Sequence, residues 1–266
     1  MKKYSIIVLT LLFVLTIFNP AGDIFAEEIT IKVGATPVPH AEILEFVKPL
    51  IAEEGIKLDI IEFTDYVTPN LALNDGSIDL NYFQHQPYLD QFNEDHGFDL
   101  LGFNKIHIEP YGLYSNKIEN IGKLKEGDII ALPNDPTNEG RALMLLAEEG
   151  VIELNPEIEL KATPLDILKN PKKLKFVELE AAQLPRILPD VTAAFINTNY
   201  ALEAGFNPLK DSIIIEGGSS PYANLLTVKP ENIDNPAIKK LAKVLRSEEV
   251  KKFILDKYEG AVVPAF

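Results

Sequence analysis

The chain has 266 residues, 46% of them hydrophobic, and a formal net charge of −15. Its length and apolar content allow one large domain or two modest ones and exclude global disorder, and its acidity argues against nucleic acid or anionic membrane surfaces as partners. The complete lack of cysteine excludes thiol catalysis, cysteine metal sites and lipid attachment to an N-terminal cysteine.

The first 26 residues have the three-part pattern of a secretory signal peptide. Lys2 and Lys3 precede an apolar run, Ile6–Phe18, and Ala26 is a small residue suited to cleavage. The run is short for a membrane span. Ile24 is an unusual residue at this distance from a cleavage site. An uncleaved signal that holds the chain at the membrane is therefore the alternative to cleavage. We predict export, to the periplasm or the cell surface.

The remaining sequence alternates short apolar strands with amphipathic helices, which is the pattern of parallel sheets covered by helices. A β-rich segment, 100–114, separates two α/β sets of similar size, and one amphipathic helix is predicted over 236–258. Strands are predicted at 28–35, 58–63, 77–82, 129–132, 174–178, 191–196, 213–216 and 225–228.

The similar size and order of the two sets predict an α/β protein with two lobes, the second inserted in the first. We place lobe 1 at residues 27–109 plus 225–266 and lobe 2 at residues 110–224, with two crossing segments between them. The strand ends of both lobes would then face an interlobe cleft, where ligands bind in such folds. One continuous sheet is the alternative.

The stretch ALPNDPTNEGRALMLL, residues 131–146, joins a buried strand to a helix. Asp135 followed by Pro136 is a good N-cap and N1 pair, and Arg141 lies about one turn into the helix. Free N–H groups, the helix dipole and the guanidinium together suit a small carboxylate. An ordinary βα unit with a solvated arginine explains this stretch alone about equally well.

An aromatic cluster with a histidine follows the third predicted strand. It includes Phe83, His85 and Tyr88, and Tyr66 occupies a comparable loop after the preceding strand. Such rings can build an apolar, polarisable pocket for a thioether or another uncharged side chain. Packing of a partly buried loop against its own lobe is the competing explanation, and for the cluster alone it is the better one.

Three asparagines also fall near predicted strand ends, namely Asn197, Asn199 and Asn224. An asparagine side chain both donates and accepts hydrogen bonds, so it suits the ammonium and carboxylate groups of a free amino acid. A single asparagine more commonly serves turn formation or helix capping. The shared position on one rim with Arg141 and the aromatic cluster favours the binding role.

Motifs for metal binding and catalysis are missing. The four histidines, His40, His85, His96 and His107, match no short zinc motif, and the sequence has no HExxH, GxSxG or glycine-rich phosphate loop. We therefore expect no metal, no cofactor and no catalytic residue. A metal-binding solute protein using His40, His85 and His107, and a secreted hydrolase using His85 with a carboxylate, are the alternatives.

Six blocks in order resemble the NlpA lipoprotein family, the substrate-binding components of methionine ABC importers. The resemblance runs from about Ile29 to the C-terminus, although the cysteine that usually carries the family's lipid is absent. The blocks are KVGATPVPHAEILE, YFQHQPYLDQ, ALPNDPTNEGRALMLL, ELEAAQLPR, AFINTNYAL and SPYANLL.

This resemblance implies a two-lobed periplasmic-binding-protein fold of the type with two crossing segments. It implies a monomeric, non-enzymatic protein that captures L-methionine, D-methionine or a methionine-containing dipeptide for a permease with its ATPase. A binding protein for another small amino acid is the nearest alternative. The implied ligand contacts are Tyr66, Phe83, His85 and Tyr88 around the side chain, Arg141 on the carboxylate, Asn197 and Asn224 on the amino and carboxylate groups, and Asn199 and Tyr111 as further contacts.

Overall fold

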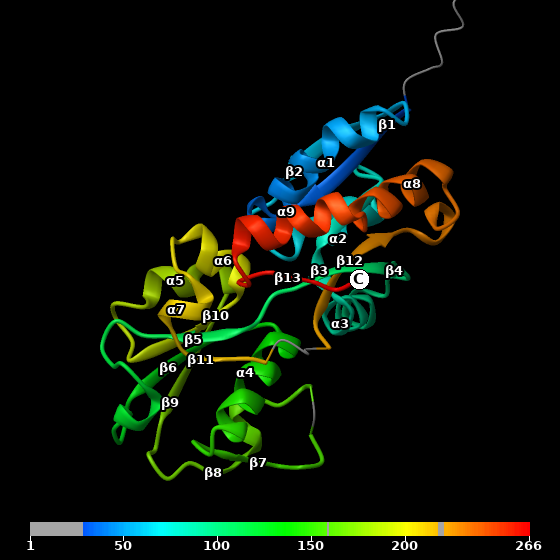
Figure 1. Ribbon diagram of the computed structural model, residues 1–266. Helices are drawn as coiled ribbons and strands as arrows, with labels where there is room; N and C mark the ends of the chain where they lie inside the picture. The colour runs from blue at the N-terminus through cyan, green and yellow to red at the C-terminus, as the bar shows by residue number, and fades with distance from the viewer. Residues whose placement is uncertain (1–28, 159, 218–220) are drawn as a thin grey trace, which may run out of the picture.

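The structure is a computed structural model that describes residues 29–158, 160–217 and 221–266. The predicted signal peptide, residues 1–26, lies outside the described residues. The described chain forms two lobes, each a sheet with helices packed on it, and both termini of the described part belong to the same lobe (Figure 1). This arrangement confirms the predicted two-lobed α/β fold.

The first lobe contains a six-stranded sheet in the order β13-β4-β12-β3-β1-β2. β1 pairs in parallel with both β2 and β3, as the alternation of strands and helices predicts. Its strands are β1 (Ile29–Ala35), β2 (Ile56–Glu62), β3 (Leu80–His85), β4 (Leu101–Ile108), β12 (Ala223–Val228) and β13 (Val263–Pro264). Its helical elements are η1 (Pro37–Ala41), α1 (Glu42–Ala52), α2 (Thr68–Asn74), α3 (Gln86–His96), η5 (Pro230–Asn232), α8 (Pro236–Leu245) and α9 (Glu248–Tyr258).

The second lobe contains a five-stranded sheet in the order β11-β5-β10-β6-β9 and a separate β7-β8 pair that the sequence does not predict. Its strands are β5 (Gly112–Tyr114), β6 (Ile129–Pro133), β7 (Glu153–Leu154), β8 (Ile167–Lys169), β9 (Lys175–Leu179), β10 (Ala193–Ile196) and β11 (Ser212–Ile215). Its helical elements are η2 (Ile121–Lys123), α4 (Pro136–Glu148), η3 (Pro164–Asp166), η4 (Ala181–Gln183), α5 (Leu184–Ile187), α6 (Thr198–Glu203) and α7 (Pro208–Asp211).

Two connections join the sheets. One runs from β4 to β5 through residues 109–111, and the other runs from β11 to β12. β12 is antiparallel to both β3 and β4, and Asn224 pairs with His85 on one side and His107 on the other. Asn224 therefore sits in the first sheet although our lobe boundaries place it in lobe 2, and the boundaries themselves stay a prediction.

Two predicted elements need correction. The strand predicted at 77–82 is β3, which begins and ends about three residues later, so Phe83 and His85 are strand residues and not loop residues. The single helix predicted over 236–258 is wrong, because α8 and α9 are separate helices. Ser247 caps α9, since its hydroxyl accepts a hydrogen bond from the Val250 N–H at 3.3 Å.

The lobes are closed on one another. The Tyr66 hydroxyl in the first lobe donates to Asn199 Oδ1 in the second at 2.6 Å, and the Tyr200 hydroxyl donates back to the Thr64 carbonyl at 3.1 Å. Leu202 of α6 packs against the hydrophobic core of the first lobe. The space between the sheets is therefore enclosed.

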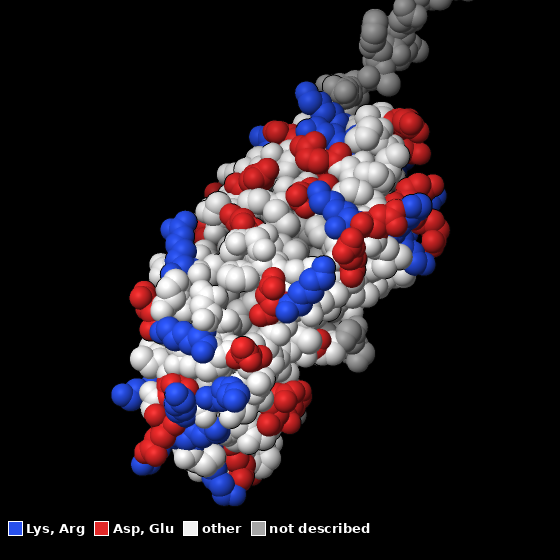
Figure 2. Space-filling model, turned by 60° about the vertical axis from the view of Figure 1, so that its left-hand side comes forward, with Lys and Arg blue, Asp and Glu red and all other residues white. Residues whose placement is uncertain are grey.

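Lysine, arginine, aspartate and glutamate intermingle over the face in Figure 2. Many exposed charges are paired, such as Lys240 with Glu54 at 3.0 Å. The acidic side chains on this face are thus distributed among basic ones rather than gathered in one patch. Within the described ranges, no helix combines the length and apolar character needed to cross a bilayer.

Gly140 brings α4 close to the chain after it. A Cβ at this position would lie 2.3 Å from the backbone oxygen of Leu160. Glycine to alanine in an open helix stabilises by about 1 kcal/mol, but here we expect Gly140→Ala to lower the free energy of unfolding by roughly 1–3 kcal/mol, because backbone must shift. Denaturant unfolding checks this, with Gly217→Ala as control since a Cβ there meets nothing within 4 Å. Equal stability of the two variants would contradict the close approach.

Candidate functional site

A cavity lies between the lobes, and all nine residues predicted as ligand contacts line it. Its volume is about 380 Å³. Hydrogen bonds between the lobes cover this space, so we expect a ligand to enter when the lobes part. The lining consists of Tyr66, Phe83, Gln84, His85, Tyr88, Glu109, Tyr111, Asn138, Arg141, Asn197, Thr198, Asn199 and Asn224.

The first lobe contributes an aromatic wall. Phe83 lies on β3, Tyr88 lies in the first turn of α3, and Tyr66 precedes α2. The ring centroids of Tyr66 and Phe83 are 5.9 Å apart, and those of Phe83 and Tyr88 are 6.0 Å apart. The Tyr88 hydroxyl donates to the Tyr66 carbonyl at 2.9 Å, which fixes the two rings together. This wall suits an apolar, polarisable side chain.

The start of α4 supplies the polar hub of the second lobe. Asp135 caps the helix as predicted, because its Oδ1 accepts from the Asn138 N–H at 3.0 Å. Its carboxylate also accepts from Asn138 Nδ2, at 2.9 and 3.0 Å. The amide of Asn138 is thereby oriented, and its Oδ1 accepts from Asn197 Nδ2 at 3.1 Å.

His85 is a neutral donor in this arrangement. Its Nδ1 accepts from the Tyr88 N–H at 3.2 Å, so the ring also caps α3. Its Nε2 therefore carries the hydrogen and donates to Asn138 Oδ1 across the cleft, at 3.3 Å. Burial, and secondarily the charge of Arg141, lowers the pKa of His85 to about 3. A general-base role at neutral pH, part of the hydrolase alternative, has no support in this geometry because Nδ1 is already engaged.

Arg141 is buried between two aromatic rings. Its Cζ lies 4.1 Å from the ring centroid of Tyr222 and 4.8 Å from that of Tyr111. Nε donates to Glu216 Oε1 at 3.0 Å, and Nη2 donates to both Glu216 Oε2 and the Glu109 carbonyl. Among the described residues its hydrogen bonds leave from Nε and Nη2, so Nη1 is the edge that remains for a ligand carboxylate.

Several buried polar atoms in the cavity lack partners. In the described part of the chain, six buried side-chain nitrogen or oxygen atoms make no hydrogen bond, and three of them belong to this lining. They are the Tyr111 hydroxyl, Asn197 Oδ1 and Asn199 Nδ2. Because unsatisfied buried polar atoms are costly and rare, their concentration here indicates a site that takes a polar ligand.

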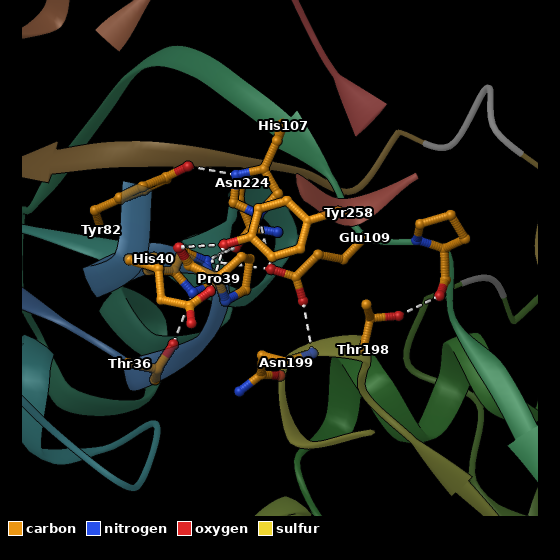
Figure 3. A network of polar contacts seen from close by, with 12 residues as sticks. Thr36, Pro39, His40, Tyr82, His107, Glu109, Thr198, Asn199, Asn224 and Tyr258 are labelled. Atoms are coloured by element: carbon orange, nitrogen blue, oxygen red, sulfur yellow. Dashed lines mark hydrogen bonds and ion pairs between the residues drawn. The ribbon is translucent and has the colours of Figure 1, made fainter. Parts of the chain in front are cut away.

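The lining residue Glu109 and, outside the lining, His40 and His107 bring their ligand-type atoms within 4.8 Å of one another. The metal alternative pairs His40 and His107 with His85, but His85 is not in this group. Glu109 Oε1 accepts from His107 Nε2 at 2.7 Å, and His40 Nε2 lies 3.3 Å from the same oxygen (Figure 3). Direct hydrogen bonds thus account for the clustering of these side chains.

Four lining residues are not among the contacts predicted from the sequence: Gln84, Glu109, Asn138 and Thr198. Asn138 carries a usable signal, since it lies three residues after the predicted N-cap and so on the first turn of the helix. Glu109 also carries one, because it is an acidic residue in a predicted crossing segment. The partners that define both residues lie on other elements, so the sequence does not reveal them.

The fold and the enclosed interlobe site define a two-lobed solute-binding protein. A sequence profile of the NlpA lipoprotein family matches residues 31–266, and the chain belongs to this family.

Curated relatives and solved structures agree with this membership. "Outer membrane lipoprotein 3" of Mannheimia haemolytica is 42% identical over 94% of this chain and 95% of the relative. "D-methionine-binding lipoprotein MetQ" of Escherichia coli K12 is 41% identical over 88% of this chain and 87% of the relative. A nutrient-binding protein from Burkholderia cenocepacia, solved bound to methionine, is 48% identical, with a TM-score of 0.87 over 89% of this chain and 100% of that structure.

Proposed function

We propose that this protein captures methionine outside the cytoplasm and delivers it to the permease of an ABC importer. The observation that carries the proposal is the coincidence, in one closed cavity, of an aromatic wall with unpaired buried polar atoms. The rings suit a thioether, and the polar atoms suit the charged end of an amino acid. The methionine-binding names of the relatives support the same ligand.

The nine predicted contacts divide by chemistry. Phe83, Tyr88 and Tyr66 would surround the methionine side chain. Arg141 Nη1, the Tyr111 hydroxyl and Asn199 Nδ2 are donors suited to the carboxylate, whereas Asn197 Oδ1 is an acceptor suited to the ammonium. His85 would close the pocket across the cleft through Asn138, with Asn224 beside it in β12. The ligand thus bridges both lobes and favours their closed arrangement.

The partners are the permease subunits and the ATPase of the importer, with the protein acting as a monomer. The named relatives are binding proteins, which supports a role without catalysis. The predicted signal peptide supports export. Because the chain has no cysteine, retention at the membrane would depend on the apolar segment 6–18 rather than on a lipid joined to cysteine.

Identification of the bound molecule tests this function. The protein is purified without added ligand and denatured, and the released small molecules are analysed by chiral chromatography and mass spectrometry. We expect close to one molecule of methionine per protein chain, and the chiral chromatography shows whether it is L- or D-methionine. If the protein releases a different amino acid, or only a dipeptide, the assignment of free methionine as the ligand is wrong.

A further inference from the structure

Glu109 is a buried carboxylate at the first connection between the lobes, and its two oxygens have different partners. Oε1 faces the Nε2 atoms of His107 and His40, at 2.7 and 3.3 Å. Oε2 accepts from the backbone N–H of Asn199 at 3.0 Å (Figure 3). Asn199 also lines the cavity. The Asn199 N–H donates to Oε2 and favours an ionised carboxylate, whereas burial raises the pKa of Glu109. A cationic ligand group would offset this effect of burial.

The two histidines are held as neutral donors to this carboxylate. The Tyr82 hydroxyl bonds His107 Nδ1, and the Thr36 hydroxyl bonds His40 Nδ1 at 2.7 Å. Burial lowers the pKa of His40 to about 4 and that of His107 to about 3. Each ring therefore carries one hydrogen, and it is on Nε2, because a carboxylate oxygen can only accept. Neither ring cancels the charge of Glu109.

The same network orients a second lining residue. His40 Nε2 lies 3.0 Å from Asn224 Oδ1. An N–H at Nε2 donates to this oxygen as well, so the Nδ2 donor of Asn224 is directed away from His40. His40 and His107 do not line the cavity, yet they fix how Glu109 and Asn224 are presented to it.

The charge balance of the cavity calls for a cation. Of the lining residues, only Glu109 and Arg141 carry a charge when the buried His85 is neutral. Arg141 pairs with Glu216 through Nε and Nη2, and its Nη1 remains for the ligand carboxylate, so Arg141 does not offset the charge of Glu109. Arg141 bonds the backbone carbonyl of Glu109, but no lysine or arginine among the described residues forms an ion pair with the Glu109 carboxylate. A buried charge without such a partner is costly. A ligand that supplies an ammonium group would remove this cost.

We propose that Glu109 is the receptor for the α-ammonium of the ligand and that His40 and His107 are positioning residues that hold its carboxylate in place. The site then requires a free, protonated α-amine. It rejects N-acylated methionine, because an amide nitrogen carries no positive charge. This inference rests on the proposed function, because it assigns one end of the same ligand.

The test compares L-methionine with 4-(methylthio)butanoate, which lacks the ammonium group but adds no bulk. Both are titrated calorimetrically into the full chain after ligand stripping and refolding. We expect the wild type to bind the deaminated acid at least about thirty-fold more weakly than methionine. We expect Glu109→Gln to lower methionine affinity by a similar factor and to leave affinity for the deaminated acid nearly unchanged. Glu248→Gln, an exposed change on α9, is the control.

Each outcome separates this inference from the proposed function. If the wild type binds methionine and the deaminated acid within a few-fold of each other, Glu109 is not an ammonium receptor although the proposed function stands. The same holds if Glu109→Gln weakens both ligands equally. If the wild type binds neither ligand, the proposed function and this inference both fall.

The positioning role has its own readout. His107→Phe keeps a ring in the buried site and removes the donor to Glu109, so we expect about ten-fold weaker methionine binding with affinity for the deaminated acid preserved. His107→Gln retains a donor and should recover part of the loss. A purely structural role would weaken both ligands equally in both variants, and that result would overturn the assignment.

Discussion

Arg141→Ala should lower the affinity for L-methionine by at least about thirty-fold, corresponding to a loss of roughly 2–5 kcal/mol. The change removes Nη1 and leaves the ligand carboxylate in a closed cavity without a cation. It also leaves Glu216 and the Glu109 carbonyl without their donor and empties the space between Tyr111 and Tyr222. We therefore expect a lower melting temperature in addition to weaker binding.

Titration of the folded variant separates the two effects. Arg246→Ala is the matched control, because Arg246 is exposed and bonds Asn104 far from the cavity, at 3.1 Å. Arg141→Lys keeps a charge but loses the planar fork, so it should fall between the wild type and alanine. An Arg141→Ala protein that binds methionine within about three-fold of the wild type would remove Arg141 from the ligand contacts.

Asn138→Ala should be nearly as damaging, although the residue has no place in the sequence-based list. Its amide joins Asp135, His85 and Asn197, so its loss leaves buried groups on both lobes without partners. Each unsatisfied buried group costs about 1–3 kcal/mol. Because the bond to His85 crosses the cleft, part of this cost falls on the closed state, and we expect methionine affinity to fall by roughly ten- to one-hundred-fold.

Asn134→Ala provides the comparison for Asn138→Ala. Asn134 lies in the turn just before α4 with its side chain exposed, and its backbone N–H bonds the Leu179 carbonyl, which the substitution keeps. Fluorescence or calorimetric titration of both variants with methionine compares their affinities. Equal affinities for the two would mean that the Asn138 amide does not organise the closed site.

The sequence predicts the architecture of the site well because parallel strands end on a common edge. β1, β3, β6 and β10 belong to parallel pairs, and the residues near their carboxyl ends converge at the cleft. This geometry explains why Phe83, Arg141 and Asn197 meet although they are far apart along the chain. Local signals such as the Asp135 cap were also sufficient for the start of α4.

Contacts between distant elements were not predictable in the same way. Glu216 lies 75 residues after Arg141, and only the folded chain shows that it occupies the Nε–Nη2 edge of the guanidinium. Likewise, His40 and His107 appear in the sequence as isolated histidines, whereas β4 and η1 bring both to Glu109. The division of the last helix had a local signal, because Ser247 followed by two glutamates is a typical helix start.

The most direct test of the central claim is calorimetric titration of L-methionine into the stripped and refolded protein. We predict saturable binding at one site per chain, together with a rise in thermal stability. At a free ligand concentration about one hundred times Kd, the native state should gain about 2.7 kcal/mol. No heat of binding and no thermal shift at about millimolar methionine, from a protein whose refolding is verified, would contradict the assignment of this cavity to methionine.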